Sequence, residues 1–104
     1  METLKRLEKT IAARASASPD SSYVAKLNAK GTAKIAQKLG EEATEAVIAA
    51  LSESKQELVG EAADVLFHLM VLLQNKGVAL DEVLAELDRR EGTSGLDEKA
   101  SRSE

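Results

Sequence analysis

The chain has 104 residues, of which 43% are hydrophobic, a formal net charge of −4 and no cysteine. This length favours a single domain, and a chain without cysteine has neither a disulfide framework nor a thiolate metal site. One tyrosine, one phenylalanine, no tryptophan and an acidic balance argue against a nucleic-acid-binding surface of stacked aromatic and basic side chains.

Apolar residues recur at helical spacing through most of the chain, and no stretch shows the sustained alternation of a strand. Serines, an aspartate and the only proline break the pattern between residues 16 and 22, and glycines end it at positions 31 and 77. The predicted helices span residues 2–15, 23–30, 32–51, 55–75 and 80–90. The sequence therefore predicts an all-α fold of four to five helices.

These helices define one predicted domain over residues 1–92. Residues 93–104 are polar, rich in glycine and serine, and without pattern, which predicts a disordered tail. The first ten residues mix acids and bases, unlike a signal peptide. The longest apolar run, residues 65–73, is interrupted by His68 and falls short of the roughly 20 residues that a membrane span needs. We expect a cytoplasmic protein with no membrane or nucleic-acid partner.

Five carboxylates stand within the two long predicted helices, among alanine, valine and leucine. They are Glu41, Glu42, Glu45, Glu61 and Asp64. Spacings of three or four residues place the carboxylates of each helix on one face. No lysine or arginine occurs between residues 39 and 54 or between 56 and 75. A carboxylate buried without a partner costs several kcal/mol, so this pattern calls for a cation from elsewhere.

The cation that suits a cluster of carboxylate oxygens is a hard divalent ion. Mg²⁺ accepts a few carboxylates and completes its shell with water and substrate phosphates, whereas Zn²⁺ prefers histidine and cysteine, and this chain has one His and no Cys. A single E-x-x-E is usually a solvated face, but two acidic pairs on neighbouring helices predict a Mg²⁺ site, with Mn²⁺ as the alternative. His68 follows in the same line and is either a satisfied core histidine or a ligand or base.

Lysines precede the acidic residues along the first long helix. Lys30, Gly31 and Thr32 lead into its N-terminus, where free N–H groups and the helix dipole favour anions. Lys34 and Lys38 follow on the face of the glutamates. We interpret Lys30, Lys34 and Lys38 as phosphate-binding residues, the alternative being ordinary solvated lysines.

The acidic pattern resembles a known signature. E-E-x-x-E followed about fifteen residues later by E-x-x-D is similar to the motif of the all-α nucleotide pyrophosphatases, the MazG-like superfamily. Within it, "SYVAKLNAKGTAKIAQKLGEEATEAVIAA" and "GEAADVLFHLMVLL" resemble the phosphoribosyl-ATP pyrophosphohydrolases of histidine biosynthesis. The likeness covers about residues 4–90, and Val24 stands where we would expect threonine.

The resemblance implies Mg²⁺-dependent hydrolysis of phosphoribosyl-ATP between its α- and β-phosphates, giving phosphoribosyl-AMP and pyrophosphate. By this likeness Glu42, Glu45, Glu61 and Asp64 hold the metal, and Glu41 supports it or orients the attacking water. Two other hypotheses stay open: a housecleaning pyrophosphohydrolase of other nucleoside triphosphates, and a non-enzymatic helical dimerisation module.

The second long helix also predicts a partner. Between residues 59 and 73 it is apolar on nearly all sides, so it needs neighbours on all sides, and the remaining short helices of one chain cannot surround it. Pairing the two central helices with those of a second chain gives a four-helix-bundle core. The resemblance points to the same arrangement, and we expect a homodimer.

Overall fold

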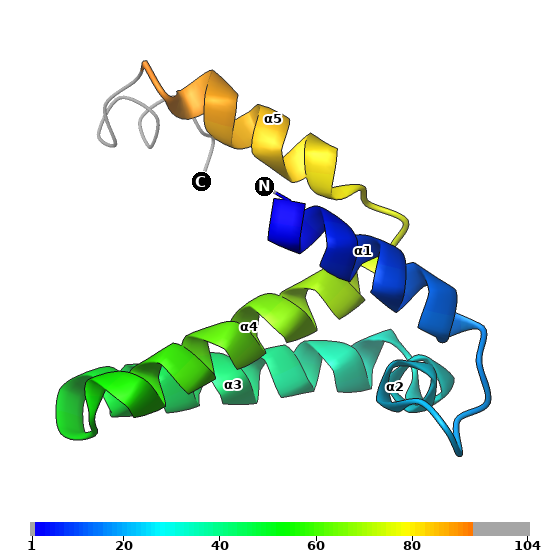
Figure 1. The fold of residues 1–104 in the computed structure, drawn as a ribbon, viewed down its shortest axis with the longest axis horizontal. Coiled ribbons are helices and arrows are strands. Elements are labelled where there is room, and N and C mark those ends of the chain that lie inside the picture. Colours follow the sequence, from blue (N-terminus) through cyan, green and yellow to red (C-terminus); the bar gives the residue numbers. More distant parts are fainter. Residues whose placement is uncertain (1, 93–104) are drawn as a thin grey trace.

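The computed structural model describes residues 2–92. It consists of five α-helices: α1 (Glu2–Ala15), α2 (Tyr23–Lys30), α3 (Thr32–Ser52), α4 (Lys55–Asn75) and α5 (Leu80–Arg90) (Figure 1). No strand occurs within the described residues, so the all-α prediction is confirmed. The predicted bounds agree with those observed except that α3 ends one residue later, at Ser52. The predicted disordered tail, residues 93–104, lies outside the described residues.

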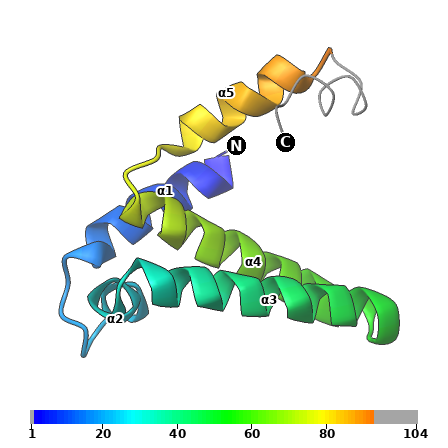
Figure 2. The same cartoon turned by 180° about the vertical axis from the view of Figure 1, so that it is seen from behind.

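Helices α3 and α4 form a long antiparallel hairpin, and both views show them side by side (Figures 1 and 2). The turn is short because Ser54 caps α4: its Oγ accepts the Glu57 N–H at 3.2 Å, and the Glu57 carboxylate accepts the Ser54 N–H at 3.3 Å. Glu45 and Glu61 are equally far along the chain from Glu53 in this turn. The hairpin therefore brings two of the predicted site residues to the same level.

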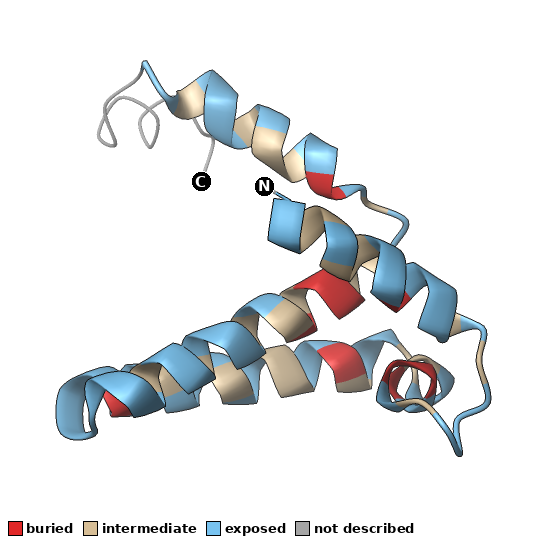
Figure 3. Ribbon diagram, viewed as in Figure 1, coloured by how far each residue is buried: buried red, intermediate tan, exposed pale blue. Residues whose placement is uncertain are grey.

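The hydrophobic core lies at the end of the hairpin that is distant from this turn. There α1 and α2 pack against α4 and α3 (Figure 3). A left-handed Gly31, with φ of +97°, lets the chain pass from α2 into α3. The buried core residues are Ile11, Val24, Leu27, Ile35, Met70, Val71 and Leu80.

The rest of the hairpin, residues 40–66, is called the hairpin arm below. It has two helices and no third layer, and Ala49 is its only buried residue. Large apolar side chains are exposed along it, including Leu51 (82%), Val59 (61%) and Leu66 (45%). This exposure agrees with the prediction that the short helices of one chain cannot surround α4.

Helix α5 lies beside α1 at the opposite edge of the molecule (Figure 1). Lys5 forms an ion pair with Asp81, and the Glu8 carboxylate accepts the Leu80 N–H at 2.8 Å. These contacts fix the start of α5 and the loop before it. Among the described residues, no helix combines the length and apolarity required to cross a membrane.

Candidate active site

Three carboxylates converge between the two helices of the hairpin arm. Glu42 and Glu45 come from α3 and Glu61 from α4, and one oxygen of each lies within 4.8 Å of the others. The Glu42 side chain is 14% exposed, Glu61 is partly buried and Glu45 is exposed. Sequence spacing predicted that these residues would meet, and the antiparallel hairpin brings them together.

The clustering of these carboxylates changes the pKa of Glu61. Burial raises the pKa of its carboxyl to about 6, with further contributions from Glu45, Glu42 and Asp64. In the described part of the chain, no lysine or arginine forms an ion pair with Glu45 or Glu61. Within residues 2–92, no ion pair therefore compensates the repulsion between Glu45 and Glu61.

This repulsion predicts how pH affects the metal-free protein. The unfolded chain releases the Glu61 proton near pH 4.5, whereas the folded chain holds it until about pH 6. The raised pKa therefore stabilises the fold below pH 4.5, and this contribution is lost as pH rises through 6. The glutamine of Glu61→Gln cannot ionise. The stability of the metal-stripped variant relative to wild type should therefore rise as the pH goes from 4.5 to about 6. Urea unfolding of both proteins from pH 4 to 7.5 measures the difference, and parallel curves would contradict it.

The cluster has the size and chemistry to hold a divalent cation. Its donors are all carboxylate oxygens, which Mg²⁺ and Mn²⁺ accept. Mg²⁺ binds oxygen at about 2.0–2.1 Å, so ligands on opposite sides of the ion stand about 4.2 Å apart. At most two of three ligands of one octahedral ion stand opposite each other, and the other pairs are about 3 Å apart, so the three oxygens, which lie within 4.8 Å of one another, would move closer together on binding it. Glu42, Glu45 and Glu61 therefore fit the predicted metal.

Glu41 lies on the flank of this cluster and has its own partners. Gln37 Nε2 donates to Glu41 Oε2 at 3.0 Å, and Lys38 Nζ lies 3.5 Å from Glu41 Oε1. The Gln37 hydrogen bond, with the charges of Lys38 and Lys34, lowers the pKa of the Glu41 carboxyl, so it stays ionised. The sequence interpretation gave Gln37 no role in the site, although its position four residues before Glu41 was an available signal.

Asp64 and His68 lie close to the cluster but outside the group of three. Asp64 is exposed, and its charge reaches Glu61, whose pKa it helps to raise. His68 is buried, and both ring nitrogens have partners: Nδ1 bonds the Asp64 carbonyl at 2.8 Å and Nε2 the Tyr23 hydroxyl at 2.9 Å. Of the two interpretations of His68, the structure agrees with a satisfied core histidine.

The three predicted phosphate-binding lysines are spread along α3 and its approach. Lys38 is near the acids, with Nζ 4.0 Å from a Glu42 oxygen. A helical rise of 1.5 Å per residue places the backbone of Lys34 about 12 Å from that of Glu42. Lys30 is exposed at the end of α2, and Gly31 leaves the first turn of α3 without a side-chain cap. The lysines therefore form a path toward the acids rather than one cluster.

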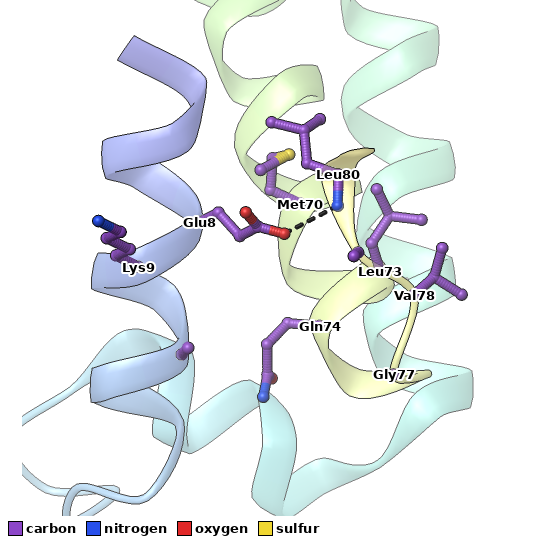
Figure 4. A pocket seen from close by; sticks show the side chains of 10 residues that line it. Glu8, Lys9, Met70, Leu73, Gln74, Gly77, Val78 and Leu80 are labelled. Atoms are coloured by element: carbon purple, nitrogen blue, oxygen red, sulfur yellow. Dashed lines mark hydrogen bonds between the residues drawn. The ribbon is translucent and has the colours of Figure 1, made fainter. Parts of the chain in front are cut away.

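A pocket of about 380 Å³ lies away from the acids, between α1 and the loop that joins α4 to α5 (Figure 4). Met70, Leu73 and Val78 give it an apolar lining, and Gln74 adds a polar group. The Glu8 carboxylate at its edge is engaged with the Leu80 N–H. None of the predicted site residues lines this pocket.

A helical hairpin that gathers glutamates from both helices, with lysines on the approach, is consistent with the resemblance to the all-α nucleotide pyrophosphatases. The model of one family, phosphoribosyl-ATP pyrophosphohydrolase, matches residues 4–91. The chain belongs to this family of hydrolases of histidine biosynthesis.

Curated relatives match along the whole chain. A phosphoribosyl-ATP pyrophosphatase of Erythrobacter litoralis is 72% identical over 100% of both chains. Proteins of the same name from Novosphingobium aromaticivorans and Dinoroseobacter shibae are 71% and 62% identical, each over 98% of this chain and over 95% and 100% of their own lengths. The family resemblance drawn from the acidic motif is confirmed.

Proposed function

We propose that the protein hydrolyses phosphoribosyl-ATP between the α- and β-phosphates, with Mg²⁺ as cofactor, releasing phosphoribosyl-AMP and pyrophosphate. One observation supports this most strongly: Glu42, Glu45 and Glu61 converge within 4.8 Å in a family whose relatives are named phosphoribosyl-ATP pyrophosphatase. A nucleotide polyphosphate brings the charge and the oxygen ligands that would complete such a site.

The carboxylates of the hairpin arm would hold the metal. Glu42, Glu45 and Glu61 supply three ligands, and Asp64, one turn beyond Glu61, is the proposed fourth. When bound there, the ion supplies positive charge to the phosphate oxygens at the bond that breaks. The raised pKa of Glu61 means that metal and proton compete for this carboxylate near pH 6.

Glu41 and the lysines complete the proposed site. The lowered pKa of Glu41 makes it a weak base, so orienting an attacking water by a hydrogen bond suits it better than removing a proton. Lys38, whose Nζ lies 3.5 Å from a Glu41 oxygen and 4.0 Å from a Glu42 oxygen, is proposed to neutralise charge on the departing pyrophosphate. Lys34 and Lys30, further along the path, are left for outlying phosphate oxygens.

We also propose that the active protein is a homodimer built on the hairpin arm. The apolar side chains of Val47, Leu51, Val59 and Leu66 are each at least 45% exposed along the arm. In each helix they recur at spacings of four or seven residues, which gives one apolar stripe per helix. Two such hairpins packed face to face give a four-helix bundle, which would bury both stripes without another element.

The test is pyrophosphate release from phosphoribosyl-ATP, followed by ³¹P NMR with Mg²⁺ and after metal removal. In ¹⁸O-labelled water, cleavage between the α- and β-phosphates must place one label in the products phosphoribosyl-AMP or pyrophosphate and no label in inorganic phosphate. We expect turnover with Mg²⁺ and none without it. Faster hydrolysis of dCTP or dUTP than of phosphoribosyl-ATP would overturn the proposed substrate, and inactivity on the whole panel would favour a dimerisation module.

A further inference from the structure

An open hollow of about 580 Å³ lies along α3, next to the carboxylate cluster. The residues that line it all come from this helix and share one of its faces: Gln37, Gly40, Glu41, Thr44, Glu45 and Ile48. Glu45 belongs both to the hollow and to the cluster of three carboxylates. A molecule in the hollow would therefore lie directly beside the proposed metal.

Gly40 leaves room in the middle of this face. Among the described residues, no atom outside the adjoining turns of α3 lies within 4 Å of where a Cβ at Gly40 would stand. Glycine is among the least favourable residues inside a helix, and Gly40 does not have the positive φ that would require it. A ligand that approaches the backbone closely would account for a glycine here.

The polar groups of the hollow are mainly hydrogen-bond acceptors. Thr44 Oγ1 donates its only hydrogen to the Gly40 carbonyl at 3.0 Å and keeps its lone pairs. Gln37 Nε2 donates to Glu41 at 3.0 Å, which leaves the amide oxygen of Gln37 to accept. Glu41 and Glu45 add carboxylates, and the lining residues include no lysine or arginine. Such a surface repels phosphate and suits a ligand that is rich in O–H donors.

We propose that this hollow binds the ribose that is joined to the α-phosphate of the substrate. Its hydroxyls donate to the acceptors around Thr44, and its carbon atoms pack on Gly40 and on Ile48, which is 48% exposed. This inference rests on the proposed function. The 5′ oxygen of the ribose is bonded to the α-phosphorus, so a metal at the bond between the α- and β-phosphates puts the ribose beside Glu45. The remaining phosphates extend toward Lys38, which does not line the hollow.

Gly40→Ala tests this, because the added methyl group meets no other part of the chain but takes up space in the hollow. Calorimetry with Mg²⁺ compares two ligands: α,β-methylene-ATP, whose bridge resists hydrolysis, and inorganic tripolyphosphate, which has no ribose. We expect Gly40→Ala to bind the ATP analogue about tenfold more weakly, the effect of losing one hydrogen bond to a charged group, and to bind tripolyphosphate as wild type does. Its melting temperature should rise by a few degrees, since alanine favours the helix.

The ribose hydroxyls are tested from the side of the ligand. Wild type should bind α,β-methylene-ATP about tenfold more tightly than its analogue lacking both the 2′ and 3′ hydroxyls, because the acceptors of the hollow are then left without donors. Thr44→Val removes one acceptor and keeps the shape of the side chain. It should weaken binding of the ATP analogue about fivefold and narrow its advantage over the dideoxy analogue.

Gly60→Ala is the matched control. Gly60 precedes Glu61 on α4 and is equally open to a Cβ, but it does not line the hollow, so its variant should gain stability and keep both affinities. Unchanged binding of the ATP analogue in Gly40→Ala would overturn the proposal, as would an equal loss for tripolyphosphate. A weaker dimer in Gly40→Ala with wild-type affinity for the analogue would instead assign the hollow to the second chain. Neither ligand is phosphoribosyl-ATP, so a wild-type protein that left phosphoribosyl-ATP intact would contradict the proposed substrate alone.

Discussion

Glu45→Gln and Glu61→Gln are each expected to abolish the rise in melting temperature that Mg²⁺ causes, and turnover with it. A glutamine keeps the size of the side chain and removes the charge that holds the ion. Metal at a hundred times its Kd stabilises the fold by about 2.7 kcal/mol, a shift on the order of 10 °C for a domain of this size. Replacing a residue that only supports a metal ligand costs 10- to 100-fold, so losing a ligand should cost at least about 100-fold in kcat/KM.

Glu53→Gln is the control for these variants. Glu53 lies in the turn of the same hairpin and is exposed. Its replacement by glutamine therefore removes an equal charge without changing the cluster. It should keep the metal-induced shift and the activity of wild type. Thermal melts across a Mg²⁺ titration, with pyrophosphate release measured on the same samples, provide both readouts. If Mg²⁺ raised the melting temperature of Glu45→Gln as much as that of wild type, Glu45 would not be a metal ligand.

Val59→Asp and Leu66→Asp are expected to dissociate the homodimer. Both residues lie on the hairpin arm, at 61% and 45% exposure in the single chain, and burying a carboxylate in an apolar interface without a partner costs several kcal/mol. Sedimentation at micromolar concentration should show a dimer for wild type and a monomer or unfolded chain for the variants. The wild-type melting temperature should rise with protein concentration, as mass action requires.

Leu87→Asp is the control that separates disruption of this interface from the effect of replacing any exposed apolar side chain with aspartate. Leu87 is 56% exposed but lies on α5, away from the hairpin arm, so its variant should remain dimeric. A wild-type protein that sediments as a clean monomer and melts cooperatively would contradict the packing of two hairpins. In that case the exposed stripes on α3 and α4 would need another partner.

The sequence by itself determined the helices of this protein. Helix bounds depend on local features: the 3.6-residue period, the Ser54–Glu57 capping box, and the glycine that ends α2. The convergence of Glu42, Glu45 and Glu61 was also predictable, because a short connection makes neighbouring helices antiparallel and their facing acids meet. These features need only residues close in the chain or one turn apart on a helix.

Only the tertiary structure decided the role of His68 and the environment of the acids. The partner of His68 is Tyr23, 45 residues away, and helical spacing gives no information about such a contact. The amount of α4 left exposed likewise depended on how many helices one chain packs against it. Burial and long-range hydrogen bonds are properties of the assembled layers, whereas periodicity and capping belong to the segments themselves.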